Sequence, residues 1–211
     1  MSNKTIESLK RHIKDNLLIY SIIILCFLVG ISVGAFTVKI VDKHQKEELF
    51  YYLRDFFQLF HNSELDSYNI FKQSFINNFQ LLTLNWILGA LLLTAPLVLF
   101  IIGFKGFVIG FTAGLLIEEF RLWGVLIFIF GIFPQNIIIV PAFIIGSVAS
   151  LSFALSFLKG KIHKTKGISF SKRFLVYSGL FGFILLFILF ASLIESYIAP
   201  FFIRVLVSNI L

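Results

Sequence analysis

The sequence predicts an all-α integral membrane protein, a polytopic helical bundle of about five transmembrane helices with one external amphipathic helix. Hydrophobic residues make up 58% of the 211 residues and charged residues only 14%, well below the share of roughly a quarter that is typical of soluble domains. Several apolar runs reach the ~20 residues needed to cross a bilayer, and polar segments separate these runs. We therefore expect residues 1–211 to form a single membrane domain.

Residues 17–38 predict the first transmembrane helix. They follow a polar stretch, residues 1–16, and have no small-residue cleavage site near their end, so we expect a retained helix rather than a signal peptide. Gly30 and Gly34 form a small-xxx-small pair, which is typical of a helix-packing face in a membrane and leaves self-association open. The single cysteine, Cys26, is expected to be a small apolar filler.

Residues 39–77 are the one sizeable polar segment, and within it the spacing of apolar residues predicts an amphipathic helix. Two interpretations of this helix stand side by side. It lies in the headgroup layer of the bilayer, or its apolar face docks a partner. The candidate docking face consists of Tyr52, Leu53, Phe56, Phe57 and Phe60.

Residues 78–117 are apolar except for "GFKGF" at 103–107. One helix of that length would overshoot the membrane at ~1.5 Å per residue. We therefore predict two spans, 78–101 and 104–117, joined by a tight turn at the glycines around Lys105, although a re-entrant second segment is an alternative. Lys105 is then an end-of-helix charge that snorkels to the interface.

An apolar run at residues 125–158 follows the short polar loop 118–124 and is interrupted by "FPQNIIIVP". Pro134 removes a backbone donor and kinks or breaks a helix, and Pro141 repeats the problem. In hydrocarbon the freed carbonyls need new donors, and the amides of Gln135 and Asn136 can supply them. Structural repair is the simpler interpretation; the alternative is a broken helix that lines a cavity.

The last predicted span, residues 174–199, follows a basic loop at 159–173 that holds six Lys or Arg and no acid. The positive-inside rule places this loop and residues 1–16 in the cytoplasm, and it places segment 39–77 and the C-terminus outside. We expect Ser63 to be accessible from outside and Ser169 from inside. Glu195 lies in the last span, where it is a proton or ion site, or an end-of-helix carboxylate that is solvated at the interface or paired with a neighbour, for which Arg204 is a candidate.

No catalytic, cofactor-binding or metal-binding residues are predicted. The four histidines are far apart in polar segments, which excludes ligand spacing for a metal, and no phosphate-binding glycine loop is present. The segments "EEFR" and "FQLFH" superficially resemble motifs of membrane-embedded glutamic proteases, but their order is reversed. The net charge of +7 is explained by cations beside the spans, so we expect no nucleic-acid partner.

Several short motifs together resemble the stage II sporulation protein M family, in order and in spacing over nearly the whole chain. They are Lys105–Gly106, Gly110–Phe111, Pro134–Gln135–Asn136, Pro141–Ala142, and Glu195 with Pro200. The resemblance implies a multi-pass protein of the mother-cell membrane at the sporulation septum of endospore-forming bacteria.

The resemblance implies that the protein is a non-enzymatic scaffold that acts during engulfment. Such a scaffold recruits and holds two peptidoglycan hydrolases, the sporulation proteins D and P, so that they remodel the septal wall. The alternative function is a small membrane permease or channel that uses the helix break at 134–136 and Glu195. No cofactor is expected on either interpretation, and the lipid bilayer is the other expected partner.

Overall fold

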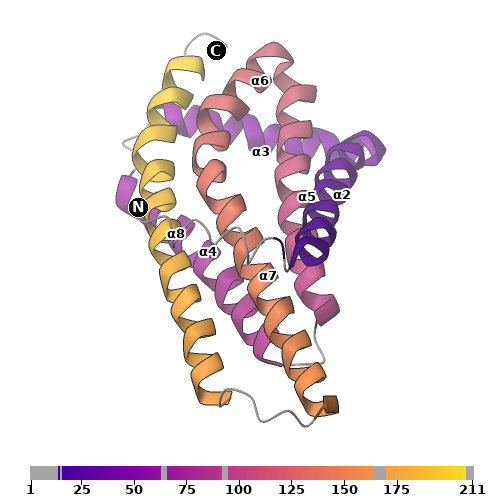
Figure 1. Ribbon diagram of the computed structural model, residues 1–211. Coiled ribbons are helices and arrows are strands. Elements are labelled where there is room, and N and C mark those ends of the chain that lie inside the picture. Colours follow the sequence, from indigo (N-terminus) through magenta and orange to yellow (C-terminus); the bar gives the residue numbers. More distant parts are fainter. Residues whose placement is uncertain (1–13, 15, 63–65, 92–94, 164–169, 208–211) are drawn as a thin grey trace.

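The fold is an all-α bundle, as the sequence predicts. The computed structural model describes residue 14 and residues 16–62, 66–91, 95–163 and 170–207, and within these ranges all regular structure is helical. The elements are α2 (Leu17–Ile40), α3 (Lys43–Asn62), α4 (Ser67–Ala90), α5 (Ala95–Phe120), α6 (Leu122–Ile127), the π-helical turn η1 (Phe128–Ile132), α7 (Phe133–His163) and α8 (Phe170–Val207). Figure 1 shows α5, α7 and α8 along the length of the bundle, with α3 crossing it near one end.

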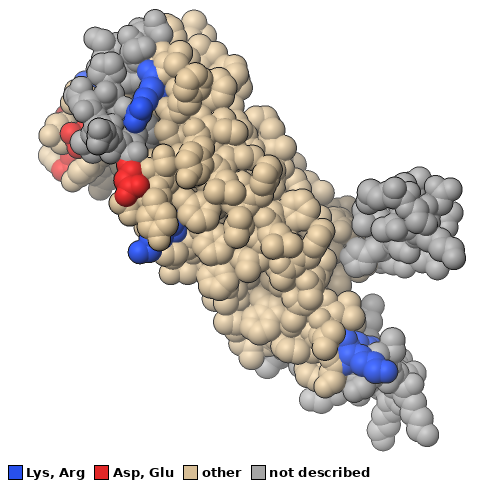
Figure 2. Space-filling model, turned by 90° about the vertical axis from the view of Figure 1, so that its left-hand side faces the viewer, with Lys and Arg blue, Asp and Glu red and all other residues tan. Residues whose placement is uncertain are grey.

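Four helical segments of the described ranges are long and apolar enough to span a membrane. They are Leu17–Ile40, Pro96–Phe120, Leu122–Ser156 and Phe170–Leu206. The more polar α4 packs beside them, against α7 and α8. On the face shown in Figure 2, charged side chains gather toward the two ends of the long molecule, and a broad uncharged band separates them. That distribution fits a bundle whose middle faces lipid.

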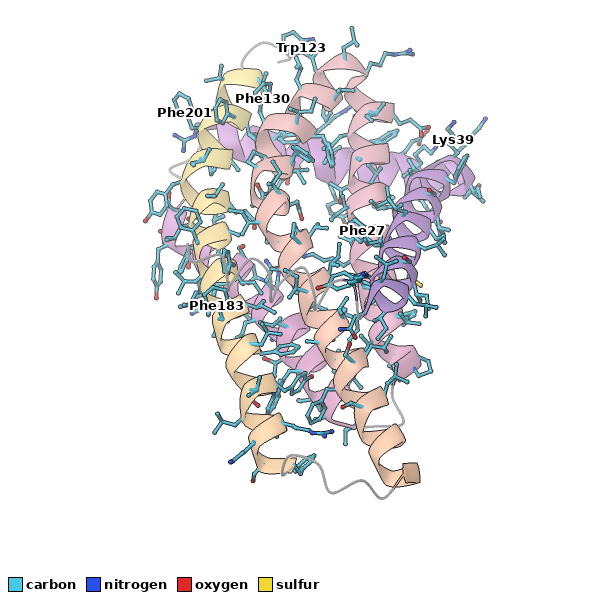
Figure 3. The ribbon with its side chains drawn as sticks, viewed as in Figure 1. Phe27, Lys39, Trp123, Phe130, Phe183 and Phe201 are labelled. Carbon is cyan, nitrogen blue, oxygen red and sulfur yellow. The ribbon has the colours of Figure 1, made fainter. Side chains whose placement is uncertain are left out.

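The surface of the bundle is apolar in its own right. Figure 3 shows Phe183 and Phe201 projecting outward from α8, and both are exposed, whereas Phe27 is buried against the core. Inside, a cluster that includes Ile23, Ile102, Phe143 and Ile188 joins α2, α5, α7 and α8. Apolar residues inside and outside are what a bilayer requires, because lipid tails do not penalise exposed Phe or Leu.

The predicted turn around Lys105 is wrong. The chain leaves α4 at Ala90 and enters α5 at Ala95, and α5 then continues without a break to Phe120. The predicted spans 78–101 and 104–117 are therefore not elements of the fold: 104–117 is the second half of α5. The polar segment 39–77 likewise contains two elements, the whole of α3 and the first part of α4.

The glycines that suggested a turn serve instead to bring α5 close to α2. A Cβ atom at Gly110 would lie 2.0 Å from the carbonyl oxygen of Ile31, and one at Gly106 would lie 2.3 Å from that of Phe27. From the other helix, a Cβ atom at Gly34 would lie 2.1 Å from the carbonyl oxygen of Phe107. The small-residue face of α2 therefore has a partner within the same chain.

The predicted loop 118–124 is a single-residue reversal. Arg121, with φ 50° and ψ −118°, separates the end of α5 from the start of α6, a backbone conformation that costs free energy in a residue other than glycine. Gly124 permits the tight return, because a Cβ atom there would lie 1.9 Å from the carbonyl oxygen of Leu116.

The break predicted at Pro134 takes the form of a π-helical turn. The five residues of η1 precede the proline, and the amide of Phe133 donates to the carbonyl of Phe128. The helix then continues through Pro141 to His163. A π turn at this place accommodates the missing donor without separating two helices, as such bulges commonly do.

Candidate functional site: a polar cavity within the bundle

A row of polar side chains on α4 faces the interior. Ser74, Asn78 and Asn85 are buried, and their spacing of four and seven residues puts them on one face of the helix. This row is absent from the predictions, because the predicted segments 39–77 and 78–101 divide α4 between an outer loop and a span. The Ser/Asn spacing was the available signal, and it indicates a helix that presents hydrogen-bonding groups to its neighbours.

Lys105 reaches this row from the middle of α5. Its Nζ donates to the Oδ1 of Asn78 over 2.8 Å and lies 5.3 Å from the ring centroid of Phe143, within the range of a cation–π contact. Ala95 begins the helix, so Lys105 lies roughly 15 Å from that end. The prediction of a snorkelling end charge is therefore wrong, because the side chain points into the bundle.

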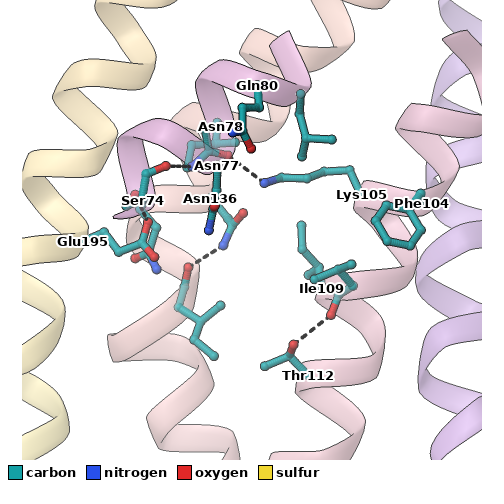
Figure 4. Close-up of a pocket in the computed structure, with 15 residues that line it drawn as sticks. Ser74, Asn77, Asn78, Gln80, Phe104, Lys105, Ile109, Thr112, Asn136 and Glu195 are labelled. Atoms are coloured by element: carbon teal, nitrogen blue, oxygen red, sulfur yellow. Dashed lines mark hydrogen bonds between the residues drawn. The ribbon is translucent and has the colours of Figure 1, made fainter. Parts of the chain in front are cut away.

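Glu195 reaches the same row from α8. Its Oε2 accepts a hydrogen bond of 2.6 Å from the Oγ of Ser74, which also lies 3.1 Å from the Oγ of Ser192. An ion pair between Glu195 and Arg204 does not fit α8, because the helix is continuous through both residues. Nine residues separate the two side chains by roughly 13 Å along the helix axis and put them on opposite sides of the helix. Figure 4 shows Glu195 and Lys105 approaching the site from opposite walls.

The two amides of the helix break have different surroundings. The Nδ2 of Asn136 donates to the carbonyl of Ile132, in the preceding turn, over 2.7 Å, so backbone repair stays the prediction for this amide. Gln135 is only 5% exposed, and its Oε1 is one of two buried side-chain atoms among the described residues that lack a hydrogen-bond partner. An orphaned acceptor of this kind is costly in an apolar interior, so Gln135 is not explained by repair.

These groups surround one cavity of about 520 Å³, whose lining includes Ser74, Asn78, Lys105, Gln135, Asn136 and Glu195; we call it the polar cavity. It adjoins a second space of about 810 Å³, which we call the apolar chamber, bordered by Phe57, Leu116, Ile127 and Ile203. Ser74, Gln135 and Glu195 border both. The structure thus places Lys105 beside Gln135, Asn136 and Glu195, whereas the predicted permease or channel combined only the helix break and Glu195.

The side chains that line the polar cavity indicate what kind of molecule it can bind. Among the described residues, no group of three or more His, Cys, Asp or Glu could hold a metal ion. The lining instead offers one ammonium, one carboxylate, amides and hydroxyls, which is a set that recognises charged and hydrogen-bonding groups.

Comparison with family models identifies the family of this chain. The family model described as stage II sporulation protein M matches residues 23–200. The chain belongs to the stage II sporulation protein M family. The match runs from within α2 into α8, so it includes α3 and every residue named above in the lining of the polar cavity. No match is found among curated proteins or among solved structures.

In this family member, α3 is fastened across one end of the bundle. Lys46 is paired with Glu118 at 2.6 Å, and Arg54 is paired with Glu119. Both acids stand in the last turn of α5, which gives the "EE" of the supposed protease motif a structural role. Phe57 supplies the apolar contact, since it is buried with Leu116, Ile127 and Ile203 and touches the ring of Phe120.

The predicted docking face is divided by this arrangement. Phe57 is 5% exposed and Leu53 packs against its cluster, so both belong to the seam between α3 and the bundle. Tyr52 and Phe56 are 68% and 49% exposed, and the Phe56 ring also packs edge-on against the ring of Phe57. The side chain of Phe60 lies outside the described residues.

Replacing the two amides should have opposite consequences. Asn136→Ala removes the side-chain hydrogen bond to the carbonyl of Ile132, so we expect the free energy of unfolding to fall by about 0.5–1.5 kcal/mol. Gln135→Leu removes an orphaned buried acceptor, so we expect unchanged or increased stability. Thermal unfolding of the detergent-purified protein measures both. Equal losses in the two variants would contradict the assignment of different roles.

Proposed function

We propose that the protein is a non-enzymatic membrane scaffold that recruits and holds peptidoglycan hydrolases, the sporulation proteins D and P, at the septum during engulfment. The family match carries the proposal. It is a sporulation membrane family, and the bundle has four segments able to span a membrane. The site of action in this proposal is the mother-cell membrane at the sporulation septum.

The architecture of α3 supports the proposal. A scaffold needs a rigid surface outside the bilayer, and α3 is held by two ion pairs and the Phe57 cluster. Its exposed face carries aromatic rings, Tyr51, Tyr52 and Phe56, of the type that supplies most of the binding energy at protein interfaces.

The proposed orientation puts this surface on the side of the cell wall. Figure 1 shows α3, the α5–α6 reversal and the end of α8 at one end of the bundle, with the start of α8 at the other. If the basic loop at 159–173 is cytoplasmic, as the positive-inside rule requires, then α3 and the C-terminal end of α8 are outside and the N-terminal end of α2 is inside.

Recovery of the hydrolases tests the scaffold. We expect Tyr52→Ser combined with Phe56→Ser to reduce co-purification of sporulation proteins D and P from sporulating cells at least several-fold, because an aromatic residue that is a hot spot of an interface contributes ~2 kcal/mol or more. Glu47→Ser with Gln58→Ser is the matched control, since both residues are exposed on α3 and their replacement removes no aromatic ring. Unchanged recovery in the aromatic variant would remove α3 from the docking surface.

A second candidate function, a small permease or channel, is favoured by the polar cavity. The helix break and Glu195 border a space of about 520 Å³, which is the feature that this function requires. It predicts flux of a solute or of protons in liposomes that contain the purified protein, with loss of flux in Glu195→Gln. Equal flux through both proteins, or no flux above that of empty liposomes, would exclude it.

A further inference from the structure

Two opposite charges stand on facing walls of the polar cavity without forming a direct ion pair. Figure 4 shows Lys105 extending from α5 and Glu195 from α8, with Asn136 between them. Each is held by a different residue of α4, Lys105 by Asn78 and Glu195 by Ser74. Among the ion pairs of the described residues, none joins the two. Separated charges in apolar surroundings are costly unless something complements them.

Gln135 adds an independent sign that the cavity is built for an occupant. Gln135 is only 5% exposed, its Oε1 has no hydrogen-bond partner, and the residue borders the polar cavity. Native proteins rarely leave such an acceptor unpaired. A hydrogen-bond donor on a bound molecule would supply the partner that the Oε1 of Gln135 lacks.

The positions of the three groups define the polarity of that molecule. Gln135 and Glu195, both acceptors, border the polar cavity and the apolar chamber, whereas Lys105 borders the polar cavity alone. An ammonium ion offers three donors, and Lys105 gives one to Asn78, which leaves donors for an anion. Gln135 and Glu195 therefore suit a cationic group that donates hydrogen bonds, and Lys105 on the opposite wall suits an anionic group.

We propose that the polar cavity binds a small zwitterion, a molecule with a primary ammonium group and a carboxylate or phosphate group. The ammonium would donate to Gln135 and Glu195, and the anionic group would accept from Lys105. The cavity's volume of about 520 Å³ lies within the usual range of small-molecule sites. A zwitterion also keeps the filled cavity neutral, whereas a lone anion or cation would leave a net charge within the membrane.

This inference concerns binding alone, so it stands or falls independently of the scaffold and of transport. The same chemistry has two sources, a free amino acid and the ethanolamine-phosphate headgroup of a lipid. The experiment uses the full chain, purified in detergent, and measures its Tm with each of two probes. L-alanine represents the free source, and phosphatidylethanolamine represents the lipid source.

We expect at least one of these probes to raise the Tm, by roughly 5–10 °C at a concentration 100 times its Kd. Acetate has only the anionic group and methylammonium has only the ammonium group, so each is expected to shift the Tm little. Phosphatidylcholine is expected to do the same, because its trimethylammonium group has no hydrogen to donate to Gln135. A shift with L-alanine alone identifies the free source, and a shift with phosphatidylethanolamine alone identifies the lipid.

Three variants test the assigned residues: Lys105→Met, Glu195→Gln and Gln135→Leu. Each is expected to abolish the ligand-induced shift, and Gln135→Leu should do so without loss of basal stability. Lys39→Met and Glu48→Gln remove the same charges away from the cavity and should retain the shift. The proposal is overturned if neither probe shifts the Tm, if acetate, methylammonium or phosphatidylcholine matches the zwitterions, or if the shift survives in Gln135→Leu.

Discussion

Phe57→Ala is expected to release α3 from the bundle. The Phe57 ring is buried with Leu116, Ile127 and Ile203 and lies 5.5 Å from the Phe120 ring, centroid to centroid. Truncating a buried Phe to Ala typically costs about 3–5 kcal/mol, through lost transfer free energy and the cavity left behind. The ion pairs of α3 with Glu118 and Glu119 do not offset that cost. Pairs with an exposed partner contribute at most about 1 kcal/mol, and Arg54 is largely exposed.

Hydrogen exchange of the α3 amides is the appropriate measurement, because local release need not unfold the other helices. We expect exchange in α3 to accelerate at least a hundredfold, which corresponds to about 3 kcal/mol. Tyr52→Ala is the matched control, since that ring is 68% exposed and its loss should leave exchange nearly unchanged. Equal acceleration in both variants would mean that α3 is not anchored through Phe57.

Gly110→Ala is expected to force α2 away from α5. The new Cβ atom would lie 2.0 Å from the oxygen, 2.7 Å from the carbonyl carbon and 2.8 Å from the Cα of Ile31. All three are backbone atoms, so no change of rotamer can relieve the overlap and the helices must separate. Overpacking of this kind costs about 1–3 kcal/mol, and a Tm lower by roughly 2–12 °C follows for a chain of this size.

Gly179→Ala and Gly182→Ala are the controls for this prediction. Both glycines lie within α8, and a Cβ atom at either has nothing within 4 Å. The added methyl should leave the Tm unchanged or raise it slightly, because Ala is favoured over Gly within a helix by roughly 0.5–1 kcal/mol. An unchanged Tm in Gly110→Ala would show that the α2–α5 contact is looser than the structure has it.

The helices that the sequence predicted well are those whose signal is local. Residues 17–38 were predicted and Leu17–Ile40 is observed, and the last span was predicted at 174–199 within the observed Phe170–Val207. The amphipathic helix within 39–77 is confirmed as α3. The length of an apolar run and the spacing of its apolar residues predict such helices. Both can be taken from the sequence without knowing what packs beside the helix.

The turn at Lys105 was mispredicted because glycine has two meanings in a membrane protein. It marks a turn where the backbone needs unusual dihedrals, and it marks a packing face where another helix comes close. "GFKGF" has the second meaning, since α2 lies against it. Only the identity of the neighbouring helix separates the two meanings, and that is not a local property.

By itself, the sequence determined that this is an all-α membrane protein of a sporulation family and which few polar residues stand out in apolar surroundings. The tertiary structure alone decided that these residues meet. Lys105 and Glu195 come from different helices, and Ser74 and Asn78 of α4 hold them on facing walls of one cavity. The reason is physical: a residue's own segment sets whether it is helical and apolar, but the packing of helix faces sets which side chains share a space.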